Sequence, residues 1–341
     1  MGKEPIIKDK SQIRVLVVDD MINMRRTVRN MLRTLGYAHI IEAENGFAAW
    51  GKLSTTIIDL AIVDWNMPEM NGIELLRKAR ADDKISKIPF IMITAEIDEE
   101  TIAEAAETEV DAYIIKPFVA KTLEEKMNAV LEKRENPSPT DTHLRLAQVF
   151  AGAGQFNKAT DELRAALNIN PNSPRVMVAL GDLHNQRGML DDAEKAYKKA
   201  ISLEPKYARA YDGLADVYKK KGDTKKSIDA MKEAITKSPK NALRQTNLGK
   251  VLLERGMVEE AKVAFESAVK NEPKNTAIQA EIGEAFLAKG LGHEAAEQFE
   301  SVLRANPNDV HTYNRLGIAY RKQGKVKEAI KIQFIGLNPT K

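Results

Sequence analysis

The first 133 residues contain short apolar runs separated by segments long enough to form helices. The runs occupy residues 13–18, 60–63, 89–93 and 113–115. Such runs are typical of strands buried on both faces, and helix-length segments between strands are typical of parallel crossover connections. The pattern therefore predicts an α/β domain built on a doubly wound parallel sheet, which a helix over residues 119–133 completes.

The apolar runs stop near residue 135, and a 34-residue repeat follows them. The prolines of the repeat are Pro171, Pro205, Pro239, Pro273 and Pro307. Its glycines are Gly154, Gly188, Gly222, Gly256, Gly290 and Gly324. Small residues recur in phase at Ala147, Gly181, Ala215, Gly249, Gly283 and Gly317, and again at Ala159, Ala193, Ser227, Ala261, Ala295 and Ala329. Glycine can adopt the left-handed conformation that ends a helix, small residues let two helices approach closely, and proline ends the next helix. The repeat therefore predicts a series of helix hairpins.

These signals divide the chain into four parts. We predict an N-terminal leader over residues 1–12, the sheet domain over 13–133, a polar linker over 134–139 and six hairpins over 140–341. The last hairpin is predicted to be incomplete, because Pro339 comes two residues early. One hairpin cannot bury its apolar side alone, so we expect the hairpins to stack into an all-α superhelix with a concave surface. The predicted core residues of the hairpins include Leu146, Leu180, Leu214, Tyr197, Phe265 and Phe299.

Composition narrows the class of protein. Lys and Arg number 52 against 49 Asp and Glu, which gives a net charge of +3. A nucleic-acid-binding protein would carry a stronger basic excess. The absence of cysteine excludes disulfides and thiolate sites. No segment approaches the ~18 consecutive apolar residues of a membrane span. We therefore predict a cytoplasmic protein with no nucleic-acid partner and no membrane insertion.

Residues suited to phosphoryl chemistry follow the predicted strands. Asp19 and Asp20 follow the first run, Asp64 follows the next, and Thr94 and Lys116 follow the last two. Ligands of an open parallel sheet bind beyond the carboxyl ends of its strands. Three carboxylates in one crevice repel each other unless a cation lies among them, and Mg²⁺ commonly bridges carboxylates to phosphate oxygens. A lysine and a hydroxyl are suited to hold a phosphoryl group that is transferred onto a carboxylate.

Each of these residues also has a structural explanation when it is taken alone. Asp19 or Asp20 could cap the following helix, Thr94 could bond a backbone group, and Lys116 could be a solvated loop charge. The residues occur together, however, at the ends of successive predicted strands. That joint placement favours a phosphoryl-transfer site.

Four stretches of the chain resemble the response-regulator receiver family, in particular its CheY-like members. They are VLVVDDMINMRRTVRNML, IVDWNMPEMNG, MITAE and YIIKPF. The resemblance covers residues 13–133 and implies a five-stranded, flavodoxin-like sheet. It also implies phosphorylation by a histidine kinase or a phosphotransfer protein, followed by autodephosphorylation, rather than turnover of a metabolite. The Lys116–Pro117 peptide bond is expected to be cis, as it is in this family.

The resemblance to receivers also assigns roles to individual residues. Asp64 is expected to be the phosphoacceptor, and Thr94 and Lys116 are expected to contact the phosphoryl oxygens. Tyr113 is expected to rotate inward as a switch. The expected Mg²⁺ ligands are Asp19, Asp20, Asp64 and the backbone carbonyl of Asn66.

The hairpins resemble tetratricopeptide repeats, whose concave surface comes mainly from the first helix of each pair. The predicted groove is polar in one part and apolar in another. The polar part consists of Arg175, Asp182, Arg209, Asp212 and Asp216, and the apolar part consists of Leu243, Leu253, Ala277, Ala280 and Leu287. Such a surface suits an amphipathic helix or an extended peptide, so we expect a protein partner of unknown identity.

The sequence therefore predicts a two-component response regulator whose repeats bind a protein as its output. Three alternatives stay open: a phosphate sink, a chemotaxis or motility regulator that its repeats dock, and a scaffold that works independently of phosphorylation. A transcription factor would need a recognition helix after the receiver, and the repeat register leaves no room for one.

Overall fold

The computed structural model describes residues 9–82, 84–95 and 110–337. The chain forms two compact units, Met1–Ser227 and Ile228–Lys341. Most of the predicted leader lies outside the described residues, as does Pro339, on which the prediction of an incomplete last hairpin rests. In the part of the chain that is described, no helix is both long enough and apolar enough to cross a membrane.

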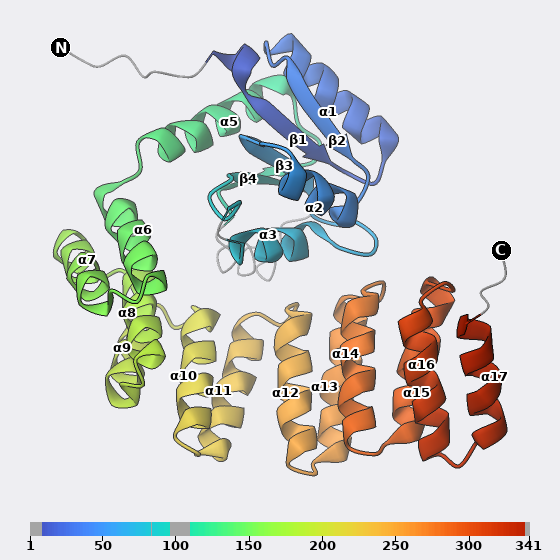
Figure 1. The fold of residues 1–341 in the computed structure, drawn as a ribbon. Helices are drawn as coiled ribbons and strands as arrows, with labels where there is room; N and C mark the ends of the chain where they lie inside the picture. The colour runs from blue at the N-terminus through green and yellow to red at the C-terminus, as the bar shows by residue number, and fades with distance from the viewer. Residues whose placement is uncertain (1–8, 83, 96–109, 338–341) are drawn as a thin grey trace, which may run out of the picture. The chain divides into compact units, whose positions relative to one another are not determined.

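The N-terminal part of the first unit is a five-stranded parallel sheet with the order β2-β1-β3-β4-β5 (Figure 1). The strands are β1 Arg14–Val18, β2 His39–Ala43, β3 Leu60–Asp64, β4 Phe90–Thr94 and β5 Ala112–Ile115. The helices are α1 Ile22–Thr34, α2 Gly46–Thr55, α3 Gly72–Arg80 and α5 Ala120–Glu135, and a short helix, η1 Lys10–Gln12, precedes β1. The order confirms the predicted flavodoxin-like, doubly wound sheet.

Alternate residues of each central strand point into two separate cores. Val63 belongs to the core beneath α2 and α3, whereas Ile62 belongs to the core beneath α1 and α5. Every residue of β3 and β4 is buried. Burial on both faces explains why these strands appear in the sequence as continuous apolar runs.

The strand β2 was not among the apolar runs of the sequence. It lies at the edge of the sheet, where only β1 pairs with it. Its residues are exposed or half-buried except for Ala43. A strand with so little burial does not need a continuous apolar sequence, so hydrophobic pattern alone does not reveal it.

Helix hairpins follow the sheet domain. Their helices are α6 Pro139–Gly152, α7 Phe156–Ile169, α8 Pro174–Gln186, α9 Leu190–Leu203, α10 Ala208–Lys220, α11 Thr224–Lys237, α12 Ala242–Glu254, α13 Val258–Asn271, α14 Thr276–Ala288, α15 Gly292–Ala305, α16 Val310–Lys322 and α17 Val326–Leu337. The six recurring glycines have φ angles between 72° and 79°, which confirms that each ends the first helix of a pair in the left-handed conformation. The recurring prolines lie directly after the second helices, as predicted.

The small residues allow close contact within the hairpins, as predicted. A Cβ atom on Gly249 would lie 2.4 Å from the ring of Phe265, and one on Gly283 would lie 2.8 Å from the ring of Phe299. Both rings are buried. The prediction that Leu146 is a core residue was wrong, because its side chain is 39% exposed. Leu146 lies on α6, which has no preceding hairpin to cover it.

Candidate functional site

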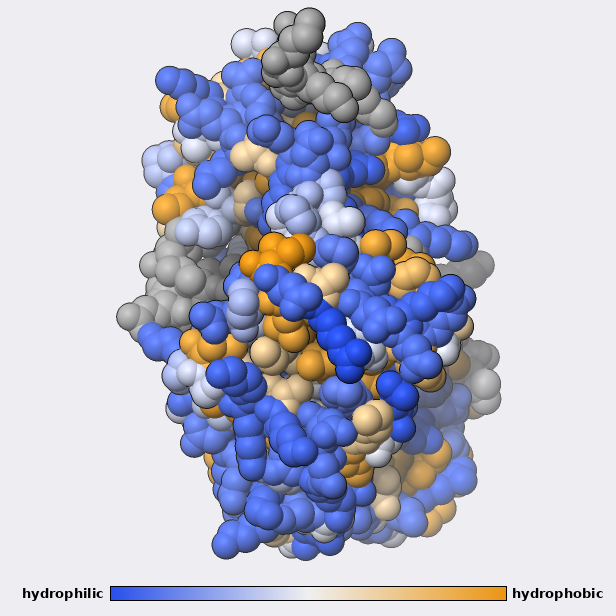
Figure 2. All heavy atoms as spheres, turned by 90° about the vertical axis from the view of Figure 1, so that its left-hand side faces the viewer, coloured by the Kyte–Doolittle hydropathy of each residue, from blue (hydrophilic) through white to orange (hydrophobic). Residues whose placement is uncertain are grey.

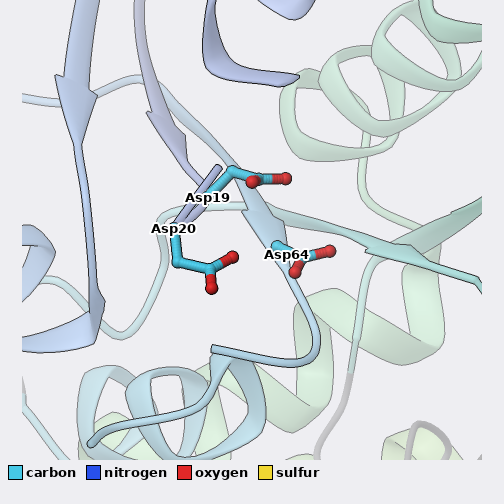
Figure 3. Close-up of side chains that lie close together, drawn as sticks. All are labelled: Asp19, Asp20 and Asp64. Carbon is cyan, nitrogen blue, oxygen red and sulfur yellow. The ribbon is translucent and has the colours of Figure 1, made fainter. Parts of the chain in front are cut away.

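Three carboxylates meet at the carboxyl edge of the sheet. The side-chain oxygens of Asp19, Asp20 and Asp64 lie within 4.8 Å of one another (Figure 3). Asp19 and Asp20 follow β1, and Asp64 is the last residue of β3. Asp19 and Asp64 are buried, whereas Asp20 is exposed. The predicted acidic cluster is therefore present, and it is open to solvent on the side of Asp20.

Lys116 joins this cluster from the strand end of β5. Its Nζ donates a hydrogen bond to Oδ1 of Asp64 at 2.6 Å and another to Oδ2 of Asp19 at 3.3 Å. The backbone N–H of Lys116 donates to the carbonyl of Thr94 at 2.7 Å, which places the lysine beside the end of β4. The Lys116–Pro117 bond is cis, as expected. The ammonium group thus offsets part of the negative charge of the three carboxylates.

Burial and neighbouring charges shift the pKa values of Asp64 and Lys116. Burial raises the pKa of Asp64 above its ordinary value, and the nearby Asp19 and Asp20 raise it further, although Lys116 acts in the opposite direction. Burial acts to lower the pKa of Lys116, but its hydrogen bonds and charge interactions with Asp64 and Asp19 outweigh this effect and raise it. Lys116 therefore stays an ammonium group, and a further cation near Asp64 would favour the carboxylate form of that residue.

Two hydrogen bonds fix the segment that carries Asp19. Oδ1 of Asp19 accepts a hydrogen bond from the backbone N–H of Met21 at 2.8 Å, at the start of α1. Arg25 of α1 donates to the carbonyl of Asp19 at 2.6 Å. Sequence reasoning missed Arg25. The only available signal was its position about one helical turn into α1, on the side that faces back toward the aspartates.

A glycine lets α3 begin directly against the end of β3. A Cβ atom on Gly72 would lie 2.3 Å from the carbonyl oxygen of Asp64 and 2.5 Å from Cε of Met92. The backbone N–H of Gly72 also donates to the carbonyl of Trp65 at 3.0 Å. Gly72 therefore holds the segment that follows the phosphoacceptor candidate in place. Sequence reasoning did not single it out.

The remaining predicted receiver residues occupy different environments. Thr94 is 4% exposed at the end of β4, one strand away from Asp64. Asn66 is exposed in the loop after β3. Tyr113 is 40% exposed, and Nζ of Lys126 lies 5.6 Å from the centroid of its ring. Thr94 thus lies with the acidic cluster at the carboxyl edge, whereas the Tyr113 side chain is turned to the surface.

The acidic cluster fits a hard divalent cation. Its ligands are carboxylate oxygens on neighbouring strand ends, which is the donor type that Mg²⁺ prefers. Among the described residues, the ion pairs of Asp64 and Asp19 are both made with the same lysine, Lys116. Receiver domains generally bind Mg²⁺ in such a pocket, and the residues present here suit that ion.

Three of the predicted groove residues of the first unit, Arg175, Asp182 and Arg209, are engaged in ion pairs between first helices. Nη1 of Arg175 lies 2.6 Å from Oδ1 of Asp141, and Nη2 of Arg209 lies 3.2 Å from Oδ2 of Asp182. Asp216 pairs with a lysine of its own helix and accepts a hydrogen bond from Asn185 of α8 at 2.6 Å. Asp212 lies on α10, the helix that also carries Arg209 and Asp216. In the second unit, Lys250 pairs with Glu281 and Arg315 pairs with Glu284 in the same way.

The apolar part of the predicted groove needs a correction. Leu243 is 45% exposed, in line with a surface role. Leu253 and Leu287 are only 2% and 7% exposed, and both belong to the core of the second unit. They cannot offer much surface to a ligand, because they pack inside that core.

The fold and the site together define a receiver-type domain: a parallel sheet of order β2-β1-β3-β4-β5 with a triple-aspartate cluster, a threonine and a lysine at its carboxyl edge. Comparison with known proteins agrees. The response regulator receiver domain family matches residues 15–128. Tetratricopeptide repeat families match residues 181–222, 208–241, 246–309 and 281–334.

Individual relatives are similar to the receiver part. The chemotaxis protein CheY-3 of Vibrio cholerae is 46% identical over 121 residues, which are 36% of this chain and 93% of that protein. CheY of Pseudomonas aeruginosa is 42% identical over 121 residues, 36% of this chain and 98% of that protein. The solved structure of Vibrio cholerae CheY4 has 31% identity and a TM-score of 0.33, and the match covers 35% of this chain and 98% of that one. The chain belongs to the response-regulator receiver family, and it continues into tetratricopeptide repeats.

Proposed function

We propose that this protein is a response regulator that accepts a phosphoryl group on Asp64 and signals through its repeats. The phosphoryl donor is the phosphohistidine of a histidine kinase or of a phosphotransfer protein. The observation that carries the proposal is the 2.6 Å contact of Lys116 with Asp64 inside the acidic cluster. Lys116 offsets negative charge around the Asp64 carboxylate, and its hydrogen bond occupies only Oδ1. The second oxygen of Asp64 is left for attack on phosphorus.

The proposed reaction is a displacement at phosphorus. An oxygen of the Asp64 carboxylate forms a bond to phosphorus while the phosphorus–nitrogen bond to the donor histidine breaks, and the imidazole keeps the electron pair and then takes a proton. The negative charge on the phosphoryl oxygens needs cations around it. Lys116 supplies one of these cations. Its 2.6 Å hydrogen bond to Asp64 places the ammonium group within reach of a phosphoryl group on that residue. The Thr94 hydroxyl, at the neighbouring strand end, supplies a hydrogen bond.

Mg²⁺ in this proposal is held by Asp19, Asp20, Asp64 and the backbone carbonyl of Asn66. When bound, the ion supplies charge neutralisation for the carboxylates and the phosphoryl oxygens. The exposure of Asp20 leaves a route from solvent to the cluster. Autodephosphorylation then requires water to reach the same phosphorus through this open side.

The output of the proposed regulator is binding of a protein through the first helices of the repeats. In the first unit, the paired charges of Arg175 and Arg209 lie on the helices that we assign to the partner. In the second unit, we assign the exposed Leu243 to partner binding. Inward rotation of Tyr113 is the proposed switch, and the 40% exposure of this side chain leaves it room to move. We assign the protein to the cytoplasm, where histidine kinases present their phosphorylated domains.

Partner capture with and without beryllofluoride, a phosphoryl mimic, tests the switching claim. We expect the wild-type protein to retain more partner when Mg²⁺ and beryllofluoride are present, and we expect the Asp64→Asn variant to show no such increase. Asp229→Asn is the matched control, because Asp229 is exposed on α11 and lies outside the receiver. Equal recovery of partner from the wild-type protein in both states would contradict the proposal.

A role in chemotaxis is the second candidate. The observation that favours it is the 46% identity of the receiver part to a chemotaxis protein. That similarity covers 36% of the chain and does not extend to the repeats. Loss of directed swimming in cells that carry only the Asp64→Asn variant would support this role, and unchanged swimming would exclude it.

A further inference from the structure

Exposed apolar side chains alone do not mark a binding site on this protein. Figure 2, which looks at the side of the molecule that carries α6 and α7, shows apolar residues among hydrophilic ones. Leu146 and Val149 of α6 are 39% and 56% exposed. Exposed apolar residues are normal on protein surfaces, whereas a recessed apolar surface beside unpaired polar groups is typical of a ligand site. The second unit contains such a recess.

A cleft opens between the second helices of two neighbouring hairpins, α13 and α15. Its volume is about 570 Å³, within the range of about 300–1,000 Å³ that is typical of ligand pockets. Phe265 and Val269 of α13 and Phe286 of α14 form its apolar lining. The rings of Phe265 and Phe286 meet edge to face, with their centroids 5.1 Å apart. Both hairpins therefore contribute to one apolar surface inside the cleft.

Glu266 of α13 lines this cleft with its carboxylate unpaired. In the part of the chain that the structure describes, no group forms a hydrogen bond or an ion pair with it. One repeat later the equivalent residue is Glu300, which accepts a hydrogen bond from the hydroxyl of Tyr320 at 2.7 Å. The equivalent of Tyr320 at the cleft is Phe286, which has no hydroxyl. The Glu266 carboxylate is therefore available to a donor that a ligand brings.

The charges around the cleft favour a basic group as that donor. The charged residues of the lining are Glu266, Glu294, Glu297, Lys262 and Lys270. Lys262 pairs with Glu294 at 3.0 Å. Glu297 lies 3.4 Å from Nε2 of His293. No ion pair between described residues joins Glu266 to Lys270, one helical turn further along α13. Glutamates thus outnumber lysines, and Glu266 is the carboxylate that lacks a cation.

Gln298 of α15 adds an amide group to the cleft. In the three preceding repeats this position is occupied by Ala196, Ala230 and Ala264. Among the described residues, none is hydrogen-bonded to the Gln298 side chain. An amide group both donates and accepts hydrogen bonds, so it can bond the N–H or the carbonyl of a peptide backbone. This group favours a peptide over a purely apolar small molecule.

We propose that the cleft binds an extended segment of a partner protein that carries a bulky apolar residue and, two positions further on, an arginine or lysine. Alternate side chains of an extended chain lie on the same side, about 7 Å apart. The apolar side chain packs against Phe286 and Val269, the basic side chain pairs with Glu266, and the Gln298 amide bonds the backbone of the segment. The site lies on second helices, so it is separate from the first-helix surface that we assign to the output partner.

Fluorescence polarisation with labelled peptides tests the proposal on the full chain. The probes are three pools of short peptides with glycine–serine flanks, whose central residues are Phe-X-Arg, Phe-X-Glu or Gly-X-Arg, where X is a mixture of amino acids. The wild-type protein should bind the Phe-X-Arg pool. It should bind the other two pools about tenfold more weakly or less, because each pool lacks one of the two side-chain contacts.

Two variants change the cleft itself. Phe286→Tyr introduces the hydroxyl that Tyr320 provides one repeat later, so it should bond Glu266 and weaken binding of the Phe-X-Arg pool about tenfold. Glu266→Gln removes the charge and should weaken binding of that pool to a similar extent. Glu266 is exposed, so this change removes no core packing.

The matched control is Glu260→Gln on the same helix. Glu260 lies 3.7 Å from Nζ of Lys232 and does not line the cleft, so this variant should bind the Phe-X-Arg pool as the wild-type protein does. Helical circular dichroism should show that all three variants are folded, and Glu266→Gln decides the outcome if Phe286→Tyr is not. Equal binding of all three pools by the wild-type protein, or no binding at about 1 mM peptide, would overturn the proposal. Equal binding of the Phe-X-Arg pool by Glu266→Gln and Glu260→Gln would overturn it as well.

Discussion

Gly72→Ala is expected to destabilise the receiver, whereas Gly51→Ala is expected to stabilise it. The two changes are chemically identical. Gly72 begins α3 against the end of β3, and an added Cβ would lie 2.3 Å from the carbonyl oxygen of Asp64. Gly51 lies in the middle of α2, and an added Cβ there would meet nothing within 4 Å.

The geometry gives the size of each effect. Real Cβ atoms do not approach other atoms more closely than 3.0 Å, so α3 and β3 must separate by about 0.7 Å in Gly72→Ala. Forced displacement of packed elements costs about 1–3 kcal/mol, and we expect about 2 kcal/mol here. In Gly51→Ala only the helix propensity changes, and we expect a gain of about 1 kcal/mol.

Tryptophan fluorescence during urea unfolding measures both effects on the receiver alone. The chain has two tryptophans, Trp50 and Trp65, and both lie in the receiver. With a denaturant dependence of about 1–3 kcal/mol per molar urea, the midpoint of Gly72→Ala should fall by about 1 M. The midpoint of Gly51→Ala should rise by about half as much. The repeats add no tryptophan signal to these transitions.

An unchanged or higher midpoint for Gly72→Ala would refute this reasoning, because it would mean that α3 does not need to begin so close to Asp64. A fall in the midpoint of Gly51→Ala would mean that an added methyl group at Gly51 does meet other atoms, and it would contradict the expected gain. Loss of phosphorylation in Gly72→Ala, measured below its unfolding transition, would further show that the position of α3 affects the site.

Three further predictions concern single side chains. Lys116→Met should raise the pKa of Asp64 further, because the lysine is the group that lowers it; a carboxyl-carbon NMR titration measures this, and a fall would count against it. Hydrogen bonds from two lysines hold the pKa of Glu194 at about 2, below its usual 4.5, so its contribution to stability is present above about pH 4.5 and lost as the pH falls through 2. Glu194→Gln should therefore cost about 1 kcal/mol at pH 7, since exposed partners are screened, and nothing near pH 2 in helical circular dichroism melts. Gly249→Ala should destabilise its hairpin by about 2 kcal/mol, and less in a Phe265→Leu background; an equal cost in both would exclude the ring clash.

Much of the fold follows from the sequence because burial on both faces leaves a simple pattern. The strands β1, β3, β4 and β5 appear as apolar runs, and the repeat period reveals the hairpins with their turn glycines. The edge strand β2 escapes, because it has little need for apolar residues. Periodicity also treats every hairpin alike, so it places Leu146 in the core although no hairpin precedes α6.

The site, like the fold, contains some features that the sequence predicts and others that it does not. Asp19, Asp64 and Lys116 could be brought together from the sequence, because parallel strands place their carboxyl ends at one edge. Contacts that depend on the path of a loop could not be foreseen. Examples are the bond from Arg25 to the Asp19 carbonyl and the approach of Gly72 to the Asp64 carbonyl.

The most direct test of the central claim is intact-mass spectrometry of the full chain after incubation with Mg²⁺ and a small phosphodonor such as acetyl phosphate. The wild-type protein and the Asp229→Asn control should each gain one phosphoryl group, and removal of Mg²⁺ should prevent the gain. The Asp64→Asn variant should gain none. A wild-type protein that stays unmodified, or an Asp64→Asn variant modified to the same extent, would contradict the assignment of Asp64 as the phosphoacceptor.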